Sequence, residues 1–361
     1  MQQKILANAV GFAVLATALS ASGEISFSGF TSINAGKVLS GTGVPQYDVP
    51  PTFLADYPIV SSYDEDWSFT PESLIGIQAN ANLAQGLTAT AQLVGRGADD
   101  YNARLEWAYL SYDINDNWTF QAGKKRLPLF YYSDFYDVGY AYVWMRPPAD
   151  TYTWQIFNYN GANLNYRDTW GEWAFGASVY GGNEDSKDNQ LLSEFFFLEP
   201  TREIWKDILG GVVTLSRDWL EVRLTHMQYT NKRYRSGVPV LWDGKDERQG
   251  KFYGMAVNGD FGNFFFLTEL NRLDLGGNLD TGMLTLGYRV GDYTPFVGYS
   301  TFKEDAEGDP EDHNTTFLGL RWDFHSSAAF KIQYDEVKDN SFDLAVAGDS
   351  KSLTFGIDVV F

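Results

Sequence analysis

The sequence contains no cysteine and only three histidines among its 361 residues. Without cysteine the chain has no disulfide framework, no thiolate zinc site and no cysteine nucleophile. Basic residues are also scarce, because 27 Lys and Arg stand against 47 Asp and Glu and give a net charge of −20. This balance argues against nucleic acid as a partner, since phosphate backbones are bound by clustered Lys and Arg.

Long hydrophobic runs are missing beyond the N-terminus. Residues 1–4 carry one positive charge, residues 5–19 are almost entirely apolar, and residues 20–23 are small. That pattern is typical of a secretory signal peptide, and an apolar run of about 15 residues is short for a membrane span of about 20. We therefore predict a signal peptide over residues 1–23 and a mature chain over residues 24–361, without a transmembrane helix.

Aromatic residues are abundant, with 26 Phe, 22 Tyr and 11 Trp, and there are 35 glycines. This composition suits closely packed strands and membrane interfaces better than helices or disorder. Apolar residues recur with period two from Glu24 onward. At the C-terminus, for example, Thr354, Gly356 and Asp358 alternate with apolar residues over 353–359. Such alternation predicts strands with one apolar and one polar face.

The connections between the predicted strands fall into two lengths. Short polar turns, such as residues 84–86, alternate with longer acidic segments, such as residues 37–69 and 182–206. A soluble sandwich can show the same strand periodicity, but short turns at one end and long loops at the other are typical of a membrane barrel. The predicted fold class is all-β: a transmembrane antiparallel up-and-down β-barrel over residues 24–361.

The strand count follows from the hairpins. A first strand near residues 24–36 and a last strand at 352–361 enclose seven hairpins, at residues 73–97, 103–126, 161–181, 207–230, 252–274, 283–302 and 314–336. The total is about 16 strands, an even number that places both chain ends on the short-turn side and leaves room for an aqueous channel.

These features resemble Gram-negative outer-membrane porins of the 16-stranded general-diffusion class. The resemblance rests on the signal peptide, the amphipathic first strand at residues 25–30, the two kinds of connection and a C-terminal strand that ends in Phe361. It implies a water-filled channel in the outer membrane of a Gram-negative bacterium, for passive diffusion of small hydrophilic solutes and ions without a cofactor. It also implies a homotrimer, contact with outer-membrane lipid and lipopolysaccharide, and recognition of Phe361 by the barrel-assembly machinery.

One long connection differs from the others. Residues 127–154 are rich in aromatic side chains, and their only acidic residues are Asp134, Asp137 and Asp150. In porins of this class the third long loop folds into the barrel, and by position this segment resembles that constriction loop. Its composition suits packing inside the barrel, although the constriction loop of the best-known general porins is more acidic.

Strand parity assigns charged side chains to the lumen, because charges must avoid lipid. The predicted constriction consists of Lys125, Arg96, Arg104, Arg167 and Glu106 on the wall and Asp134 and Asp137 on the loop. Opposed charges across it would create a transverse field that favours polar solutes. The parity of Lys124 and Arg126 points outward, but both lie where the chain bends, so their direction is left open. In all, the predicted lumen wall carries eight basic and five acidic residues: Arg96, Arg104, Lys125, Arg167, Arg223, Arg289, Arg321 and Lys331, with Glu106, Glu221, Glu269, Asp323 and Asp335.

The sequence also allows other functions. The aromatic rings of residues 127–154 could stack on sugars, which would make the channel substrate-selective for sugars or, given its basic wall, for anions. A barrel enzyme would need a base, and only His226, His313 and His325 are available, none near an obvious Ser partner; no metal-binding motif is present. The acidic residues within 304–312 lack the spacing of a calcium-binding loop. They could bind divalent cations that also contact lipopolysaccharide phosphates, or they could simply be solvated.

Overall fold

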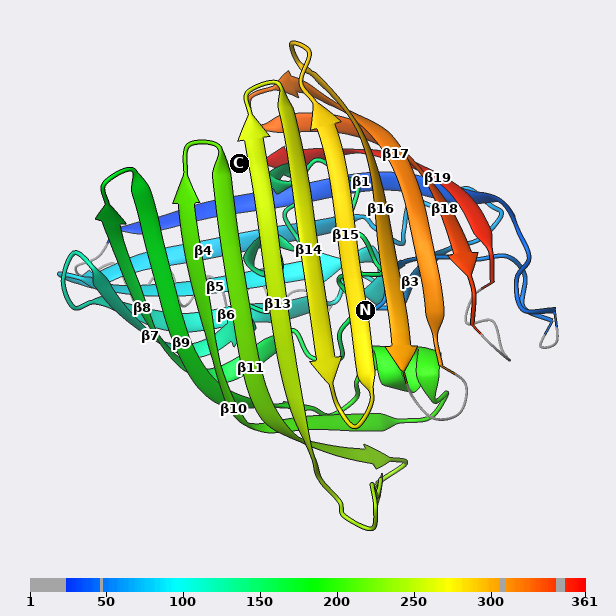
Figure 1. Ribbon diagram of the computed structural model, residues 1–361, viewed down its shortest axis with the longest axis horizontal. Helices are drawn as coiled ribbons and strands as arrows, with labels where there is room; N and C mark the ends of the chain where they lie inside the picture. Colours follow the sequence, from blue (N-terminus) through cyan, green and yellow to red (C-terminus); the bar gives the residue numbers. More distant parts are fainter. Residues whose placement is uncertain (1–23, 46–47, 306–309, 342–347) are drawn as a thin grey trace, which may run out of the picture.

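A computed structural model describes residues 24–45, 48–305, 310–341 and 348–361 of the chain (Figure 1). Sixteen strands form its wall. They are β1 (Ile25–Gly41), β4 (Leu74–Ala84), β5 (Leu87–Arg96), β6 (Ala103–Asp113), β7 (Trp118–Arg126), β8 (Asn158–Trp170), β9 (Trp173–Ser186), β10 (Thr201–Arg217), β11 (Leu220–Arg235), β13 (Arg248–Phe261), β14 (Phe264–Asp274), β15 (Asn278–Tyr288), β16 (Tyr293–Asp305), β17 (Asp312–His325), β18 (Ala328–Asp339) and β19 (Ser350–Val360).

The wall is a closed antiparallel barrel. Each strand pairs with its neighbours along the chain, and β1 closes the ring by pairing with β4 on one side and with β19 on the other. A two-residue strand, β12 (Val238–Pro239), only extends the end of β11. The predicted fold class and strand count are therefore confirmed.

The outside of the barrel is apolar and the inside is polar. On β19, Ser352, Thr354 and Asp358 are at most 2% exposed, whereas Ile357, which points the other way, is 41% exposed. A soluble protein would show the reverse. The period-two pattern fits a wall whose outer face contacts lipid and whose inner face contacts water and polar groups.

The short turns lie at one end of the barrel, as Figure 1 shows at the top of the strand pairs β8–β9, β10–β11 and β13–β14. The longer loops lie at the opposite end, but several are shorter than the sequence suggested, because the strands extend into them. β1 continues to Gly41, β10 begins at Thr201, and β14 and β15 are joined by residues 275–277 alone. The pairing along these extensions continues the ladders of the wall.

The long loops contain the remaining elements: β2 (Phe53–Asp56), β3 (Ser61–Tyr63), the 3₁₀ helices η2 (Gly97–Asp99), η3 (Ser133–Phe135) and η4 (Gly139–Ala141), and the π-helix η5 (Leu191–Phe196). Among the described residues, no helix is long and apolar enough to cross a membrane. The predicted signal peptide, residues 1–23, and part of the acidic run at 304–312 lie outside the described residues.

The segment between β7 and β8, residues 127–157, folds into the barrel. Its Phe130, Trp144 and Trp154 side chains are at most 2% exposed and pack against rings of the inner wall, including Phe252 on β13 and Phe317 on β17. Its apolar composition thus buries one face of the segment on the wall strands β10–β17. Open space remains at the short-turn end of the barrel, where cavities are lined by residues such as Gln121 on β7, Asn258 on β13 and Arg321 on β17.

Candidate pore constriction

Cations of the wall hold the backbone of the inserted segment. Arg321 on β17 donates hydrogen bonds of 2.8 Å to the carbonyls of Tyr140 and Tyr142. Lys331 on β18 and Arg223 on β11 donate to four further carbonyls, those of Gly139, Trp144, Leu129 and Pro128. These predicted lumen cations therefore anchor the loop, and their charge is directed at its carbonyl dipoles.

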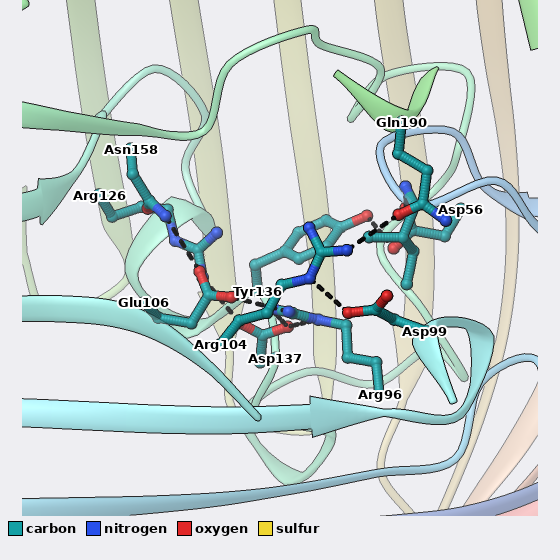
Figure 2. A network of polar contacts seen from close by, with 11 residues as sticks. Asp56, Arg96, Asp99, Arg104, Glu106, Arg126, Tyr136, Asp137, Asn158 and Gln190 are labelled. Atoms are coloured by element: carbon teal, nitrogen blue, oxygen red, sulfur yellow. Dashed lines mark hydrogen bonds and ion pairs between the residues drawn. The ribbon is translucent and has the colours of Figure 1, made fainter. Parts of the chain in front are cut away.

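A cluster of four buried charges joins the loop to the other side of the wall (Figure 2). Asp137 lies 2.6 Å from Arg96 and 2.7 Å from Arg126, and Glu106 lies 2.7 Å from Arg96 and 3.3 Å from Arg126. All four side chains are at most 8% exposed. Two cations and two anions thus neutralise one another, so this cluster fixes the loop in place.

The cluster lies where the wall is incompletely paired. The β6–β7 ladder ends at the pair Ala108 and Lys124, although β6 begins at Ala103 and β7 continues to Arg126. Side chains bridge the gap, because Glu106 on β6 accepts a hydrogen bond of 3.1 Å from Asn158 on β8 and contacts Arg126. This local separation turns Arg126 inward, against its strand parity.

A second anchor comes from the loop itself. Arg146 lies 3.0 Å from Asp335 on β18, donates to Thr354 on β19 at 2.7 Å and makes a bidentate pair with Glu72. Its guanidinium also lies 5.0 Å from the ring centroid of Phe53 on β2. Arg146 therefore joins the constriction loop to two wall strands and to the first long loop.

A third anchor is a buried carboxylate. Asp150 lies 2.7 Å from Nδ1 of His313 and accepts a hydrogen bond of 2.6 Å from Ser300, while the Tyr57 hydroxyl lies 2.9 Å from Nε2 of the same imidazole. Burial alone would raise the pKa of Asp150, but the charge and hydrogen bond of His313 and the Ser300 hydroxyl hold it below its usual value.

Asp56, on β2, connects the first loop to the constriction loop. The Tyr136 hydroxyl donates a hydrogen bond of 2.7 Å to Asp56. Burial raises the pKa of Asp56 from 3.8 to about 6, although the Tyr136 hydrogen bond and the charge of Arg96 act in the opposite direction. Burial likewise raises the pKa of Tyr136, so its hydroxyl remains a donor.

Two predicted constriction residues, one on the wall and one on the loop, lie close enough for their charges to interact. Lys125 points inward from β7, donates hydrogen bonds to Gln121 and Asn163, and lies 4.8 Å from the ring centroid of Tyr109. Asp134 is exposed on the loop and is close enough for its charge to act on Lys125. Within the part of the chain that the structure describes, no ion pair neutralises either group.

The other two predicted cations lie elsewhere in the lumen. Arg104 is at the outer rim, where it pairs with Asp99 and lies 3.4 Å from Gln190 of the β9–β10 loop. Arg167 is exposed near the short-turn end of β8, on the lumen face. The structure therefore joins Arg96, Glu106 and Asp137, sets Lys125 against Asp134, and places Arg104 and Arg167 away from both groups.

Two cavities occupy the inner half of the lumen. One, of ≈ 830 Å³, is bounded by loop residues such as Tyr131 and by short-turn residues such as Gly171 and Trp219. The other, of ≈ 320 Å³, is lined by Arg167, polar side chains of β7 and β8 and the facing parts of β9 and β10. Open space therefore lies between the constriction loop and the short-turn end of the barrel.

Sequence reasoning missed several anchoring residues. The sequence does not single out Arg146, it suggests His313 only as a catalytic base, and strand parity leaves the direction of Arg126 open. Strand parity has no information about residues within a loop or beside a broken ladder. Strand parity does place some of the wall partners of these residues in the lumen, such as Asp335, which pairs with Arg146.

The fold defines a class of protein: a 16-stranded membrane barrel with an inserted loop and a polar lumen. Comparison with known families agrees, because a family model described as Gram-negative porin matches residues 9–360. The chain belongs to this family. It is an outer-membrane channel for passive diffusion, and both the family and the fold are those of a channel rather than an enzyme.

Solved structures with the same fold are distant in sequence. The anion-selective porin from Comamonas acidovorans is 14% identical, with a TM-score of 0.59 over 94% of this chain and 100% of that one. OmpF of Salmonella typhi, in complex with daunomycin, is 12% identical, with a TM-score of 0.60 over 93% and 97%. The trimer form of OmpT from Vibrio cholerae is 14% identical, with a TM-score of 0.60 over 94% and 100%. No curated protein matches the sequence.

Proposed function

We propose that solutes pass between the inserted loop and the β7–β9 wall, and that the charges of Lys125 and Asp134 set the field at the narrowest part of this path. The observation that carries the proposal is that, among the described residues, neither group has an ion-pair partner, while most other inward charges are neutralised. Opposite charges across a low-dielectric constriction orient water and polar solutes and penalise apolar ones.

We propose general diffusion of small hydrophilic solutes and ions rather than selective sugar uptake. Phe130, Trp144, Tyr152 and Trp154 are buried against the wall, so these rings are unavailable for stacking on a sugar. One observation supports the alternative, because Tyr131, Tyr132 and Tyr142 line the larger inner cavity. Substrate-selective uptake of sugars or anions is therefore the second candidate.

Liposome swelling with uncharged sugars of graded size separates the two candidates. General diffusion predicts rates that fall smoothly with solute size and rise linearly with concentration. Selective uptake predicts saturation with one sugar. Single-channel conductance and reversal potential in a planar bilayer test the pore itself, and a correctly folded protein without conductance would refute it.

The anion preference expected from eight basic wall residues is weakened by the contacts of the loop. Arg96, Arg223, Arg321 and Lys331 are bonded to the inserted segment, and Arg289 pairs with Asp260 at 2.9 Å. The remaining lumen charges are more evenly balanced. We therefore expect modest ion selectivity in simple salts.

Further partners follow from the family resemblance and remain proposals. A homotrimer is supported by a part of the wall with short strands and exposed apolar residues. β7 has nine residues, compared with 17 in β10, and Ile75 and Ile77 on β4 are exposed. Lipid and lipopolysaccharide would contact the outer apolar face, and the barrel-assembly machinery would recognise the strand that ends in Phe361.

The buried His313 contacts Asp150 and Tyr57 through its two ring nitrogens, which supports a structural role over a catalytic one.

A further inference from the structure

The smaller inner cavity has an unusual lining for a site beside a constriction. Its volume is ≈ 320 Å³, and its polar lining includes Arg167 with Thr119, Gln121, Asn165, Ser178 and Thr214. These residues come from four neighbouring strands, β7, β8, β9 and β10. The set offers one cation and several neutral hydrogen-bonding groups, and none of the described residues that line the cavity is a carboxylate.

The guanidinium of Arg167 is free to bind a solute. Over the described residues its side chain makes no hydrogen bond or ion pair. The backbone beside it is fixed, because the Arg167 carbonyl accepts a hydrogen bond of 2.7 Å from Asn117 and its amide donates one of 2.9 Å to the Asn117 carbonyl. Its nearest acidic neighbour in sequence, Asp168, is engaged by the Tyr166 hydroxyl at 2.7 Å.

The space next to the guanidinium is kept open by a glycine. Arg167 is paired across the β8–β9 ladder with Gly176, and Gly176 is paired across the next ladder with Thr214. A Cβ at Gly176 would meet only the Thr214 Cβ, at 3.8 Å, so the row between Arg167 and Thr214 carries no side chain. A small solute can occupy this gap.

The neutral groups next to the cation form an ordered amide network. Gln121 accepts hydrogen bonds from Asn163 at 3.1 Å and Asn165 at 3.2 Å, and Lys125 donates to both Gln121 and Asn163. The network runs along the wall from Lys125 at the constriction to the cavity at Arg167. Amide and hydroxyl groups can exchange hydrogen bonds with hydroxylated solutes at little cost.

We propose that this cavity is a low-affinity subsite for small hydroxylated carboxylates, such as sugar acids, and that Arg167 binds their carboxylate. A guanidinium presents a planar fork that matches a carboxylate in a bidentate pair, and the adjacent amides and hydroxyls bind the hydroxyl groups. Lys125 attracts the anion into the constriction, and Arg167 receives it on the inner side. The inference rests on the proposed path along the β7–β9 wall and names a solute class for it.

Single-channel currents of the whole protein in potassium gluconate and in potassium chloride test the subsite. The wild-type gluconate current is expected to saturate with concentration, while the chloride current rises almost linearly. Arg167→Gln is expected to raise the half-saturating gluconate concentration about three- to tenfold, because one charge-assisted contact in a hydrated lumen is lost. The chloride conductance of this variant is expected to change little. Arg167→Lys keeps the charge without the planar fork, so its half-saturating gluconate concentration is expected to lie between those of the wild type and Arg167→Gln.

Two further variants sharpen the result. Asn165→Ala is expected to weaken gluconate saturation but not the response to acetate, which has no hydroxyl group. Lys251→Gln is the matched charge control, because Lys251 is exposed on β13 beside the outward-facing Tyr253. It should leave gluconate currents unchanged.

The outcomes distinguish the subsite from the pore. Two results would refute the subsite: gluconate currents of the wild type that rise linearly, or the same half-saturating gluconate concentration in the wild type and Arg167→Gln. Chloride conductance in either case would still support the pore. A folded protein without any chloride conductance would refute the pore as well. Gluconate saturation that responds to Lys125→Gln but not to Arg167→Gln would assign binding to the constriction and refute the inner subsite.

Discussion

Nη2 of Arg96 lies 2.6 Å from Oδ1 of Asp137, so a cation at the outer end of β5 is paired with a carboxylate of the inserted loop. Oδ2 of the same carboxylate lies 2.7 Å from Arg126 at the end of β7. One loop residue therefore connects two wall strands on either side of the unpaired stretch between β6 and β7 (Figure 2). This arrangement makes Asp137 the most informative position for testing how the loop is held.

Asp137→Asn should loosen the loop. The substitution leaves Arg96 and Arg126 buried with Glu106 as their only carboxylate in the cluster, and removing one partner of a buried pair costs about 3 kcal/mol. The expected result is noisier single-channel current and closure at lower voltage than in the wild type. Arg104→Gln is the control, because its exposed pair with Asp99 contributes at most about 1 kcal/mol. Currents as quiet as those of the wild type in Asp137→Asn would argue against an anchoring role.

Lys125→Glu should change ion selectivity. The variant places a second negative charge opposite Asp134, so cations are favoured and anions are repelled at the constriction. The reversal potential in a salt gradient should move toward cation selectivity, more strongly at low ionic strength, where screening is weakest. Lys251→Glu makes the same charge change on the outer face and should have no such effect. An unchanged reversal potential in Lys125→Glu would contradict the proposed field.

Asp56 should make the attachment of the first loop depend on pH. Its pKa is raised from 3.8 to about 6, so the folded state binds this proton more tightly than the unfolded state. The stabilisation is complete below about pH 4 and is lost as the pH rises through 6. Because the residue is partly exposed, we expect about 1–2 kcal/mol. The protection factors for amide hydrogen exchange of residues 53–63, which correct for the intrinsic exchange rate at each pH, should be larger at pH 5 than at pH 7.5.

Asp56→Asn provides the matching control for the pH experiment. The neutral amide can still accept the Tyr136 hydrogen bond but does not titrate, so the difference in protection between pH 5 and pH 7.5 should disappear. Should the variant keep the full pH dependence of the wild type, another group would be responsible.

Phe361→Ala should slow assembly more than it lowers stability. The backbone of Phe361 closes the barrel through hydrogen bonds of 2.9 Å and 2.7 Å with Gly29, and these do not need the side chain. The residue as a whole is 66% exposed. We expect slower appearance of folded barrel in membranes that contain the assembly machinery, with a similar thermal midpoint once folded. Equal assembly rates for both proteins would refute the role of the ring as a signal.

Much of the architecture follows from local patterns in the sequence. Period-two alternation in segments such as residues 353–359 reflects a wall between lipid and water, and each strand carries this information independently of the others. Strand parity is therefore sufficient to place Lys125, Arg223 and Lys331 on the lumen side. Strand parity does not predict the contact partners of Arg223 and Lys331, because these partners lie on a loop without regular periodicity.

The amino-acid pattern is sufficient to predict a membrane barrel of about 16 strands with an aromatic loop, because lipid on one side and water on the other impose a pattern on every strand. The three-dimensional packing adds that Arg96 and Asp137 neutralise each other and that Arg126 turns inward beside a broken ladder. It also leaves Lys125 and Asp134 without an ion-pair partner among the described residues. Such contacts join residues far apart in the chain, and their geometry depends on where the loop packs against the closed wall.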